Sequence, residues 1–215
     1  MKGLGIGIVL IILVGLGGFL YRNALEQPVE PVACPLDAKL CPDGTSVSRT
    51  GTSCTFAACL PPNVSLPDAR ISFAQPDGYG AVTRSGSAVI AAYEVPSGSS
   101  TPSSASVVIR RYAIEASSTA LDTIKKTAIG GTSGLPVGAT QFSSTVLGSH
   151  RFTVVAIDRF EGVVDSAYYL ARSADVLRFD AIDRNVMNWT DQNLDVSTLP
   201  ANRALQKLLA TLQSE

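Results

Sequence analysis

Four cysteines lie close together near the start of the chain, and their spacing points directly to cross-linking chemistry. Cys34, Cys41, Cys54 and Cys59 follow the pattern C-x6-C-x12-C-x4-C, and no other cysteine is present among the 215 residues. The residues around them are rich in Pro, Gly, Ser and Thr, so they offer little apolar core of their own. A segment of this kind keeps a defined shape when disulfides or a metal ion cross-link it.

Disulfides fit this cysteine segment better than zinc does. Structural zinc sites commonly use C-x2-C pairs together with histidines, whereas this segment has no such pair and the only histidine, His150, is distant in sequence. We therefore predict two disulfides among the four cysteines, with no metal and no cofactor. Three pairings remain open. Because disulfides persist in oxidising compartments, the segment is expected to lie outside the cytoplasm.

A second group of reactive side chains runs from His150 to Arg184. Arginine offers a planar fork that matches a carboxylate, so we expect this group to form ion pairs between neighbouring strands. On the strand expected at 176–182, Arg178 and Asp180 would share one face. The acids of the group are Asp158, Glu161, Asp165, Asp175, Asp180 and Asp183, and the arginines are Arg151, Arg159, Arg172, Arg178 and Arg184.

Catalysis by the same acids is the alternative, because two carboxylates at the right separation can hydrolyse a glycosidic bond. Other reaction signatures are missing: the chain has no G-x-S-x-G motif and no calcium loop of the D-x-[DN]-x-[DN]-G type. The glycine-rich stretch 130–138 lacks the Lys-Ser/Thr of a phosphate-binding loop. We expect His150 to be exposed or structurally hydrogen-bonded. No catalytic or metal-binding residue is assigned, and the ligand is unknown.

The first residues of the chain form an apolar stretch. Residues 3–21 contain no charge, and as a helix they would span roughly 28 Å, close to the thickness of a bilayer core. A cleaved signal peptide is the rival interpretation, but small residues suitable for cleavage are poorly placed. We predict a signal anchor at 1–22 that binds the lipid bilayer through 3–21, followed by a linker at 23–33. The protein would be a single-pass membrane protein with its C-terminal part extracytoplasmic.

After the cysteine segment at 34–62, the remaining residues 63–215 show the pattern of one folded domain. Strands are expected at 70–74, 88–95, 107–114, 139–147, 150–158, 163–172 and 176–182. A helix is expected at 117–127, with Ser117 or Ser118 as its N-cap and an Asp122–Lys126 pair. A last helix starts near Pro200 and carries an apolar stripe of leucines at 205–212. This order predicts an α+β fold, with helices packed against an antiparallel sheet.

The cysteine segment resembles a motif of uncharacterised secreted and membrane-anchored bacterial proteins, notably from candidate-phylum bacteria with small genomes. The residues that carry the resemblance are Cys41-Pro-Asp-Gly44, Arg49 and Cys54-x-Phe-x-x-Cys59. The resemblance implies no activity. The Cys41-Pro-Asp-Gly run is also faintly similar to Kazal-type protease inhibitors, although that family uses six cysteines. Protease inhibition by this segment is therefore a further, weaker alternative.

Within the domain at 63–215, residues 68–215 resemble the PsbP-like fold. The similarity rests on an opening strand that leads into a turn (Ile71-Ser-Phe73, then Pro76-Asp-Gly78-Tyr79), on an aromatic strand with Tyr168-Tyr169, and on the Leu-rich helix at 205–212. The resemblance implies a binding or accessory role more than catalysis.

The charge balance narrows the choice of partner. The formal net charge is −1, so the chain lacks the basic excess typical of nucleic-acid binding, and no nucleic-acid partner is expected. We therefore predict a membrane-anchored extracytoplasmic accessory or binding protein of the cell envelope that is not an enzyme and has an envelope protein as its partner. The alternative is a cell-surface hydrolase that uses carboxylates of the 158–183 region.

Overall fold

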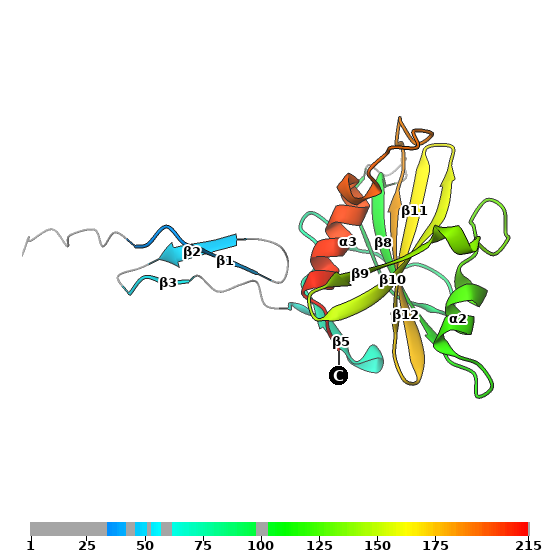
Figure 1. Ribbon diagram of the computed structural model, residues 1–215, viewed down its shortest axis with the longest axis horizontal. Helices are drawn as coiled ribbons and strands as arrows, with labels where there is room; N and C mark the ends of the chain where they lie inside the picture. The colour runs from blue at the N-terminus through cyan, green and yellow to red at the C-terminus, as the bar shows by residue number, and fades with distance from the viewer. Residues whose placement is uncertain (1–33, 42–45, 51–52, 57–61, 98–102, 215) are drawn as a thin grey trace, which may run out of the picture. The chain divides into compact units, whose positions relative to one another are not determined.

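The computed structural model describes residues 34–41, 46–50, 53–56, 62–97 and 103–214 (Figure 1). The signal anchor and linker predicted at 1–22 and 23–33 lie outside these residues. Within the described ranges, no helix is both long enough and apolar enough to cross a membrane. The chain divides into two compact units, and each is considered by itself.

The cysteine segment forms a small three-stranded sheet. Strand β1 (Ala38–Leu40) lies beside β2 (Ser46–Thr50), which pairs antiparallel with β3 (Thr55–Phe56). The side chains of β1 are exposed, so apolar burial contributes little to this sheet. Cross-links and polar contacts must hold it instead.

The larger unit is built on a seven-stranded sheet in the order β6-β7-β8-β12-β11-β10-β9. Every neighbouring pair in it is antiparallel. Alternation of apolar and polar residues lets each strand present one side chain to each face in turn. The strands are β6 (Gly80–Ala81), β7 (Val89–Glu94), β8 (Ala105–Ala113), β9 (Phe142–Leu147), β10 (His150–Phe160), β11 (Val163–Ala171) and β12 (Asp175–Asp183).

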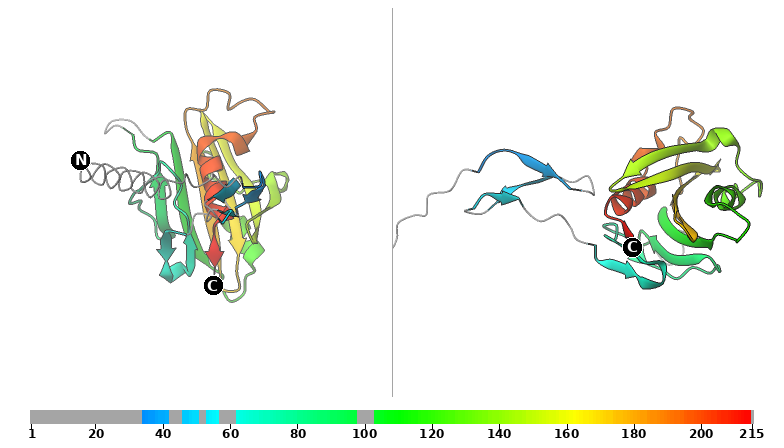
Figure 2. Two further views of the ribbon diagram at one scale, coloured as in Figure 1. Left: turned by 90° about the vertical axis from the view of Figure 1, so that its left-hand side faces the viewer. Right: turned by 60° about the horizontal axis from the view of Figure 1, so that its bottom comes forward.

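One face of this sheet is covered by the helix α3 (Pro200–Ala210). Its leucines Leu205, Leu208 and Leu209 are almost fully buried and pack against Phe152 and Phe179 of the sheet. A second small sheet, in the order β13-β5-β4, lies at the C-terminal end of α3, where β13 continues the chain (Figure 2). Its strands are β4 (Val64–Leu66), β5 (Ile71–Phe73) and β13 (Gln213–Ser214), and the short 3₁₀ helix η1 (Pro67–Ala69) joins β4 to β5.

The opposite face carries the short helix α2 (Ala120–Thr127) and a smaller core that includes Ile124, Val155 and Tyr169. Thr119 caps α2: its hydroxyl accepts from the backbone N–H of Asp122, whose carboxylate accepts from the N–H of Thr119 in return. Two further 3₁₀ helices, η2 (Ala139–Gln141) and η3 (Val196–Thr198), precede β9 and α3.

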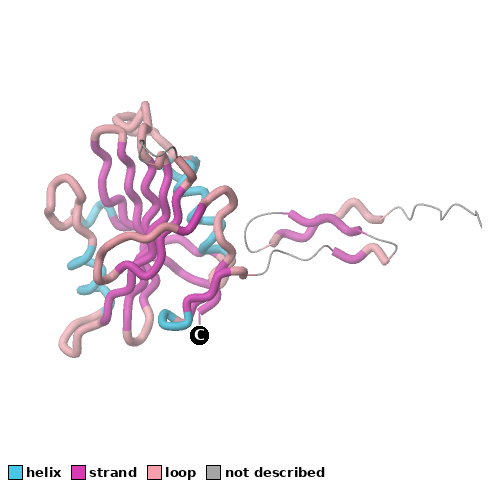
Figure 3. The backbone as a smooth tube through the Cα atoms, turned by 180° about the vertical axis from the view of Figure 1, so that it is seen from behind, coloured by secondary structure: helices cyan, strands magenta, loops and turns pink. Residues whose placement is uncertain are grey.

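The predicted α+β fold class is wrong. The structure is dominated by antiparallel strands, and its described residues contain only the two α-helices α2 and α3 (Figure 3). The strands β4, β6 and β13 were not expected, because runs of two or three residues carry no recognisable alternation. Beside its strands, the described part of the chain has one α-helix of eight residues and one of eleven, so the fold is β-rich.

Most of the longer elements lie where the sequence places them. The seven expected strands correspond to β5, β7, β8, β9, β10, β11 and β12, and the last helix to α3. The predicted start of α2 is wrong, because its N-cap is Thr119 and neither Ser117 nor Ser118. Lys126 pairs with Glu115, over 3.0 Å, where a pair with Asp122 was predicted. Asp122 belongs instead to the cap of its own helix.

Candidate functional site

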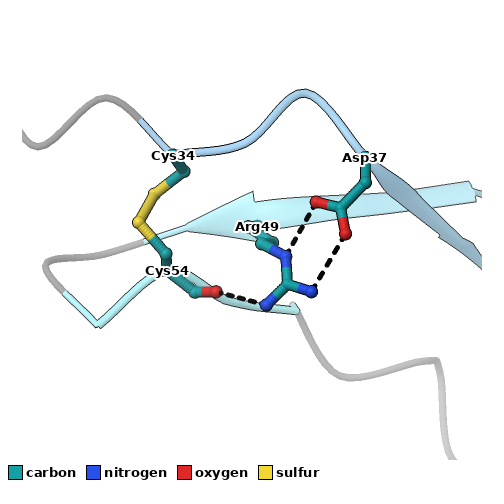
Figure 4. Close-up of a disulfide and its surroundings, with 4 residues drawn as sticks. All are labelled: Cys34, Asp37, Arg49 and Cys54. Carbon is teal, nitrogen blue, oxygen red and sulfur yellow. Dashed lines mark hydrogen bonds and ion pairs between the residues drawn. A yellow bond between two sulfur atoms is a disulfide. The ribbon is translucent and has the colours of Figure 1, made fainter.

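The cysteine segment is cross-linked as predicted. Cys34 and Cys54 form a disulfide between positions 20 residues apart (Figure 4). Cys41 is buried and is disulfide-bonded as well, while Cys59 lies outside the described residues. The predicted disulfide chemistry is therefore confirmed for Cys34, Cys41 and Cys54.

Arg49 organises the surroundings of this disulfide (Figure 4). Its Nε and one terminal nitrogen donate to the two carboxylate oxygens of Asp37, over 2.7 and 2.9 Å, and the other terminal nitrogen donates to the carbonyl of Cys54, over 3.0 Å. The guanidinium also lies 4.1 Å from the centre of the Phe56 ring. The hydrogen bond from Arg49 holds the pKa of Asp37 below its ordinary value. These contacts are structural, and they connect Asp37, which lies three residues after Cys34, to the backbone of Cys54.

The acids predicted as alternative catalytic groups do not share one open cleft. Asp175 accepts from Arg111 over 2.6 Å and from both forks of Arg172 over 2.6 and 2.7 Å. The same two arginines donate to the carbonyls of Asp68 and Ala69 in η1. Through these two arginines, Asp175 links the first residue of β12 to η1.

Asp180 lies on the α2 face of the sheet and is fully buried. Its carboxylate accepts from Arg178 over 2.6 Å and forms a second ion pair with Arg110. Arg178 also donates to the carbonyl of Thr127 at the end of α2. As predicted from strand alternation, Arg178 and Asp180 share one face, and Leu177, Phe179 and Ala181 point to the other.

Asp165 lies among the same buried groups and is the exception. Its Oδ1 has no hydrogen-bond partner among the described residues. Burial, followed by repulsion from Asp180, raises the pKa of Asp165 to about 8, while Arg178 and Arg110 oppose the rise. Asp165 is therefore protonated at neutral pH. Its Oδ1 is buried although the residue as a whole is half-buried, and it lies on β11 between Asp158 of β10 and Ile182 of β12.

The remaining acids of this region have local roles. Asp183 accepts from the backbone N–H of Ala201 over 2.7 Å and so caps α3, whose own N-cap residue Leu199 provides no side-chain bond. Asp158 accepts from the N–H and the hydroxyl of Thr132, both over 2.7 Å, and so holds the glycine-rich stretch 130–138 against β10. Glu161 occupies a turn with a positive φ of 48°. Asp158 and Asp165 lie opposite each other in the register of β10 and β11, and the charge of Asp158 adds to the raised pKa of Asp165. Among the described residues, arginine ion pairs are made by Asp175 and Asp180 of this region.

His150 and the aromatic residues are also used structurally. The His150 ring contacts the hydroxyls of Ser149 and Ser214, over 3.1 and 2.9 Å, as expected for a structural histidine. Tyr168 and Tyr169 are buried, so they form no recognition surface. Trp189 is half-buried and packs against the ring of Phe160.

An open groove beside α3 is the site that sequence reasoning missed. It has a volume of about 250 Å³ and runs between the turn at 74–79 and one side of α3. Tyr79 and Leu208 contribute to its buried floor, and Arg203 and Lys207 stand exposed along the α3 wall. Burial, and after it the charge of Asp183, raises the pKa of Tyr79 to about 12, so its hydroxyl stays neutral. In the sequence, the signal for this groove is the pair Arg203 and Lys207, four positions apart on the last helix. Such a pair is also typical of an ordinary solvent-exposed helix face.

Comparisons with known proteins place no family name on the chain. No family model matches it, and no curated protein matches its sequence. A crystal structure from Bacteroides thetaiotaomicron VPI-5482 is similar over 68% of this chain and 45% of that chain, with a TM-score of 0.43 and 9% identity. This chain thus spans less than half the length of that structure, and the likeness carries no argument about function. None of these matches bears on the cysteine motif or on the similarity to PsbP-like proteins, so both resemblances stay predictions.

Proposed function

We propose that the protein is an extracytoplasmic accessory protein of the cell envelope that binds a partner protein and performs no reaction of its own. The observation that carries this proposal is the way polar groups are used in the larger unit. Four acids of 158–183 are hydrogen-bonded within the fold, namely Asp158, Asp175, Asp180 and Asp183, whereas the two cations of the α3 groove are exposed to solvent. A surface of this kind suits binding better than catalysis.

The disulfides support the extracytoplasmic location. Three described cysteines are oxidised, and such bonds persist where the surroundings are oxidising. The apolar run at 3–21, read from the sequence alone, would hold the protein at the membrane. Tether and disulfides together favour a protein that acts close to the outer side of the cell membrane.

The location is tested with a membrane-impermeant biotinylating reagent that labels exposed amines. Lys125 and Lys126 on α2 and Lys207 on α3 are exposed, so an extracytoplasmic domain is labelled in intact cells from which any outer barrier has been removed. A known cytoplasmic protein serves as the control. Labelling that appears only after the cells are lysed would contradict the proposal.

The binding role is tested by cross-linking in the native cells, followed by capture of the full chain under oxidising conditions. The same capture with Asp175→Asn and Asp158→Asn shows whether the partner depends on the acids or on another surface. We expect a partner to be captured equally well with these variants. Turnover of an envelope glycan by the purified protein that is lost in an acid variant would instead favour the hydrolase alternative.

A further inference from the structure

Two exposed cations line the α3 groove, and neither is neutralised by a carboxylate among the described residues of the larger unit. Arg203 and Lys207 are four positions apart, so they lie one turn from each other on the same side of the helix. Arg203 donates to the carbonyl of Thr198 over 3.1 Å, and neither residue forms an ion pair with any described acid. By contrast, Arg110, Arg111, Arg172 and Arg178 all have carboxylate partners.

The wall opposite these cations is preformed. Residues 76–79 form a turn in which the N–H of Tyr79 donates to the carbonyl of Pro76 over 3.2 Å, and Gly78 has a φ of +78°, which glycine adopts without strain. The N–H of Ala74 donates to the hydroxyl of Thr211 over 2.9 Å, which ties this wall to the end of α3. A partner would therefore meet a groove that needs little ordering.

The two walls offer different chemistry. The α3 wall is cationic, and the turn exposes the carboxylate of Asp77, which can accept hydrogen bonds. Between them lie apolar surfaces that include Pro76, Ala204 and Leu208. A ligand that combines an anionic group, an apolar group and a hydrogen-bond donor would complement both walls and the surface between them.

We infer that this groove binds an acidic peptide segment of the partner protein. An apolar side chain of the segment fills the space over Ala204 and Leu208, and a neighbouring carboxylate is held by Arg203 and Lys207. A backbone N–H of the segment donates to Asp77. This inference rests on the proposed function, which requires a protein partner but leaves its chemistry open.

Other ligand classes fit the groove less well. Its volume of about 250 Å³ accommodates an inserted side chain and is below the ~300–1,000 Å³ of most small-molecule pockets. A fatty carboxylate has an anionic and an apolar part but no donor for Asp77. A polyanion such as a nucleic acid is bound through many phosphates, whereas this groove offers two cations, and the net charge of −1 gives it no general attraction.

The test measures binding of peptides to the full chain, purified with its disulfides intact. The probes are two fluorescein-labelled hexapeptide pools that share a central Leu or Phe and differ at the flanking positions, which are Asp or Glu in one pool and Lys or Arg in the other. Fluorescence anisotropy reports binding. Dodecanoate below its micellar concentration is the third probe, added as a competitor.

Lys207→Glu reverses the charge of the groove at an exposed position, and Ala204→Phe fills its apolar part. Lys125→Glu is the matched control, because Lys125 is also an exposed lysine in the last turn of a helix, on α2. Circular dichroism verifies that each variant is folded. Since the Lys207→Glu variant still has an open groove, it remains informative if Ala204→Phe fails to fold.

We expect the acidic pool to bind the wild type and the Lys125→Glu variant alike. Lys207→Glu should weaken binding about tenfold or more, the size expected when a hydrogen bond to a charged group is lost, and Ala204→Phe should abolish it. Equal binding by the wild type and Lys207→Glu, or preference for the basic pool, would overturn the inference. Binding of dodecanoate alone, in a manner that depends on Lys207, would assign the groove to an amphiphile instead.

Capture of the partner from native membranes separates this inference from the proposed function. If Lys207→Glu captures the same partner as the wild type does, the binding role stands and the assignment of the groove fails. If no partner is captured by either protein while the acidic pool binds the groove, the groove assignment stands and the accessory role fails.

Discussion

The guanidinium of Arg178 donates from Nε to the carboxylate of Asp180, two positions away on the same face of β12, over 2.6 Å. Both side chains lie beneath α2, where Arg110 also pairs with Asp180. Burial of charged groups is costly unless they are paired and hydrogen-bonded, and here each has several partners. The pair therefore links β8, β12 and the end of α2 through one carboxylate.

Asp180→Asn should strongly destabilise the protein, because it leaves Arg178 buried without its anionic partner. The expected loss in the free energy of unfolding is about 3 kcal/mol, the lower end of the range for broken buried pairs. The lower end applies because Asp165 lies nearby and can ionise once Asp180 is neutral. Urea unfolding of the oxidised protein at pH 7, followed by circular dichroism, measures the loss.

Glu115→Gln is the matched control for this measurement. It removes the Lys126–Glu115 pair, whose side chains are 71% and 70% exposed, so the cost should stay below about 1 kcal/mol. Equal losses in the two variants would show that Asp180 is worth no more than a surface carboxylate.

Asp165 should make the protein less stable as the pH rises from about 4 to about 8. Burial raises its pKa to about 8 in the folded state, so the folded protein holds a proton that the unfolded chain, with a pKa near 4, releases across this window. The stability contributed by that proton is complete below the lower value and is lost as the pH passes through the upper one. Urea unfolding at intervals between pH 4 and 9 should show a decline of up to about 1.4 kcal/mol per unit.

Asp165→Asn should flatten this decline, because asparagine does not titrate. Asp122→Asn, at the exposed cap of α2, should keep it. A decline from pH 4 to 8 that persists in Asp165→Asn would assign the decline to another group.

At lower pH a different loss of stability is expected, from Asp175. The pKa of Asp175 is held below its ordinary value by Arg172 and Arg111 against the effect of burial, so its stabilising contribution disappears as the pH falls below about 4.

Removal of the side-chain amide of Asn202 should lower the free energy of unfolding, because it leaves the buried Tyr168 hydroxyl without a hydrogen-bond partner. Tyr168 donates to Asn202 over 2.8 Å, and Gln206 donates to both residues, over 3.2 and 2.9 Å. Asn202→Leu should destabilise the protein by about 1–3 kcal/mol, because the Tyr168 hydroxyl loses its acceptor under α3. Tyr168→Phe added to this variant should cost little more, and a double-mutant cycle measures the coupling. Strictly additive losses would mean that the two residues do not act together.

Arg49→Lys should make the Cys34–Cys54 disulfide easier to reduce. Lysine keeps the charge but cannot donate to both oxygens of Asp37 and to the Cys54 carbonyl at once, so the surroundings of the disulfide loosen. The rate of reduction by dithiothreitol, followed by mass mapping of the peptides, should rise relative to the wild type. Arg151→Lys is the control, because Arg151 is exposed and makes no such contact among the described residues. Unchanged rates in Arg49→Lys would show that Arg49 does not protect the disulfide.

The long strands could be predicted from sequence because β-branched and aromatic residues alternate along them over several positions. The fold class could not, because β4 and β13 are too short to show a period, and they form by pairing with β5. The start of α2 was misplaced because Ser117, Ser118 and Thr119 are all suitable caps. Only Thr119 stands three residues before Asp122 and can complete a capping box.

The candidate site was harder to predict than the elements that form it. The cysteines could be interpreted because their chemistry depends on local spacing and on a coil-rich composition. The α3 groove depends on contacts between distant segments: the bond from Ala74 to Thr211 joins positions 137 apart. Lys207 therefore looked like an ordinary solvated lysine, since a helical stripe does not show what lies beside it.

The pairing of β13 with β5 also bears on how the chain acquires its structure. Ser214 lies opposite Ile71, and Gln213 lies opposite Ser72, so the second small sheet closes only after every strand between them has been synthesised. Asp183 likewise caps α3 from a strand 18 residues upstream. Contacts of such long range slow folding, so the nascent larger unit should stay unfolded for much of its synthesis. A chain in that state can still be threaded through a membrane pore before it folds.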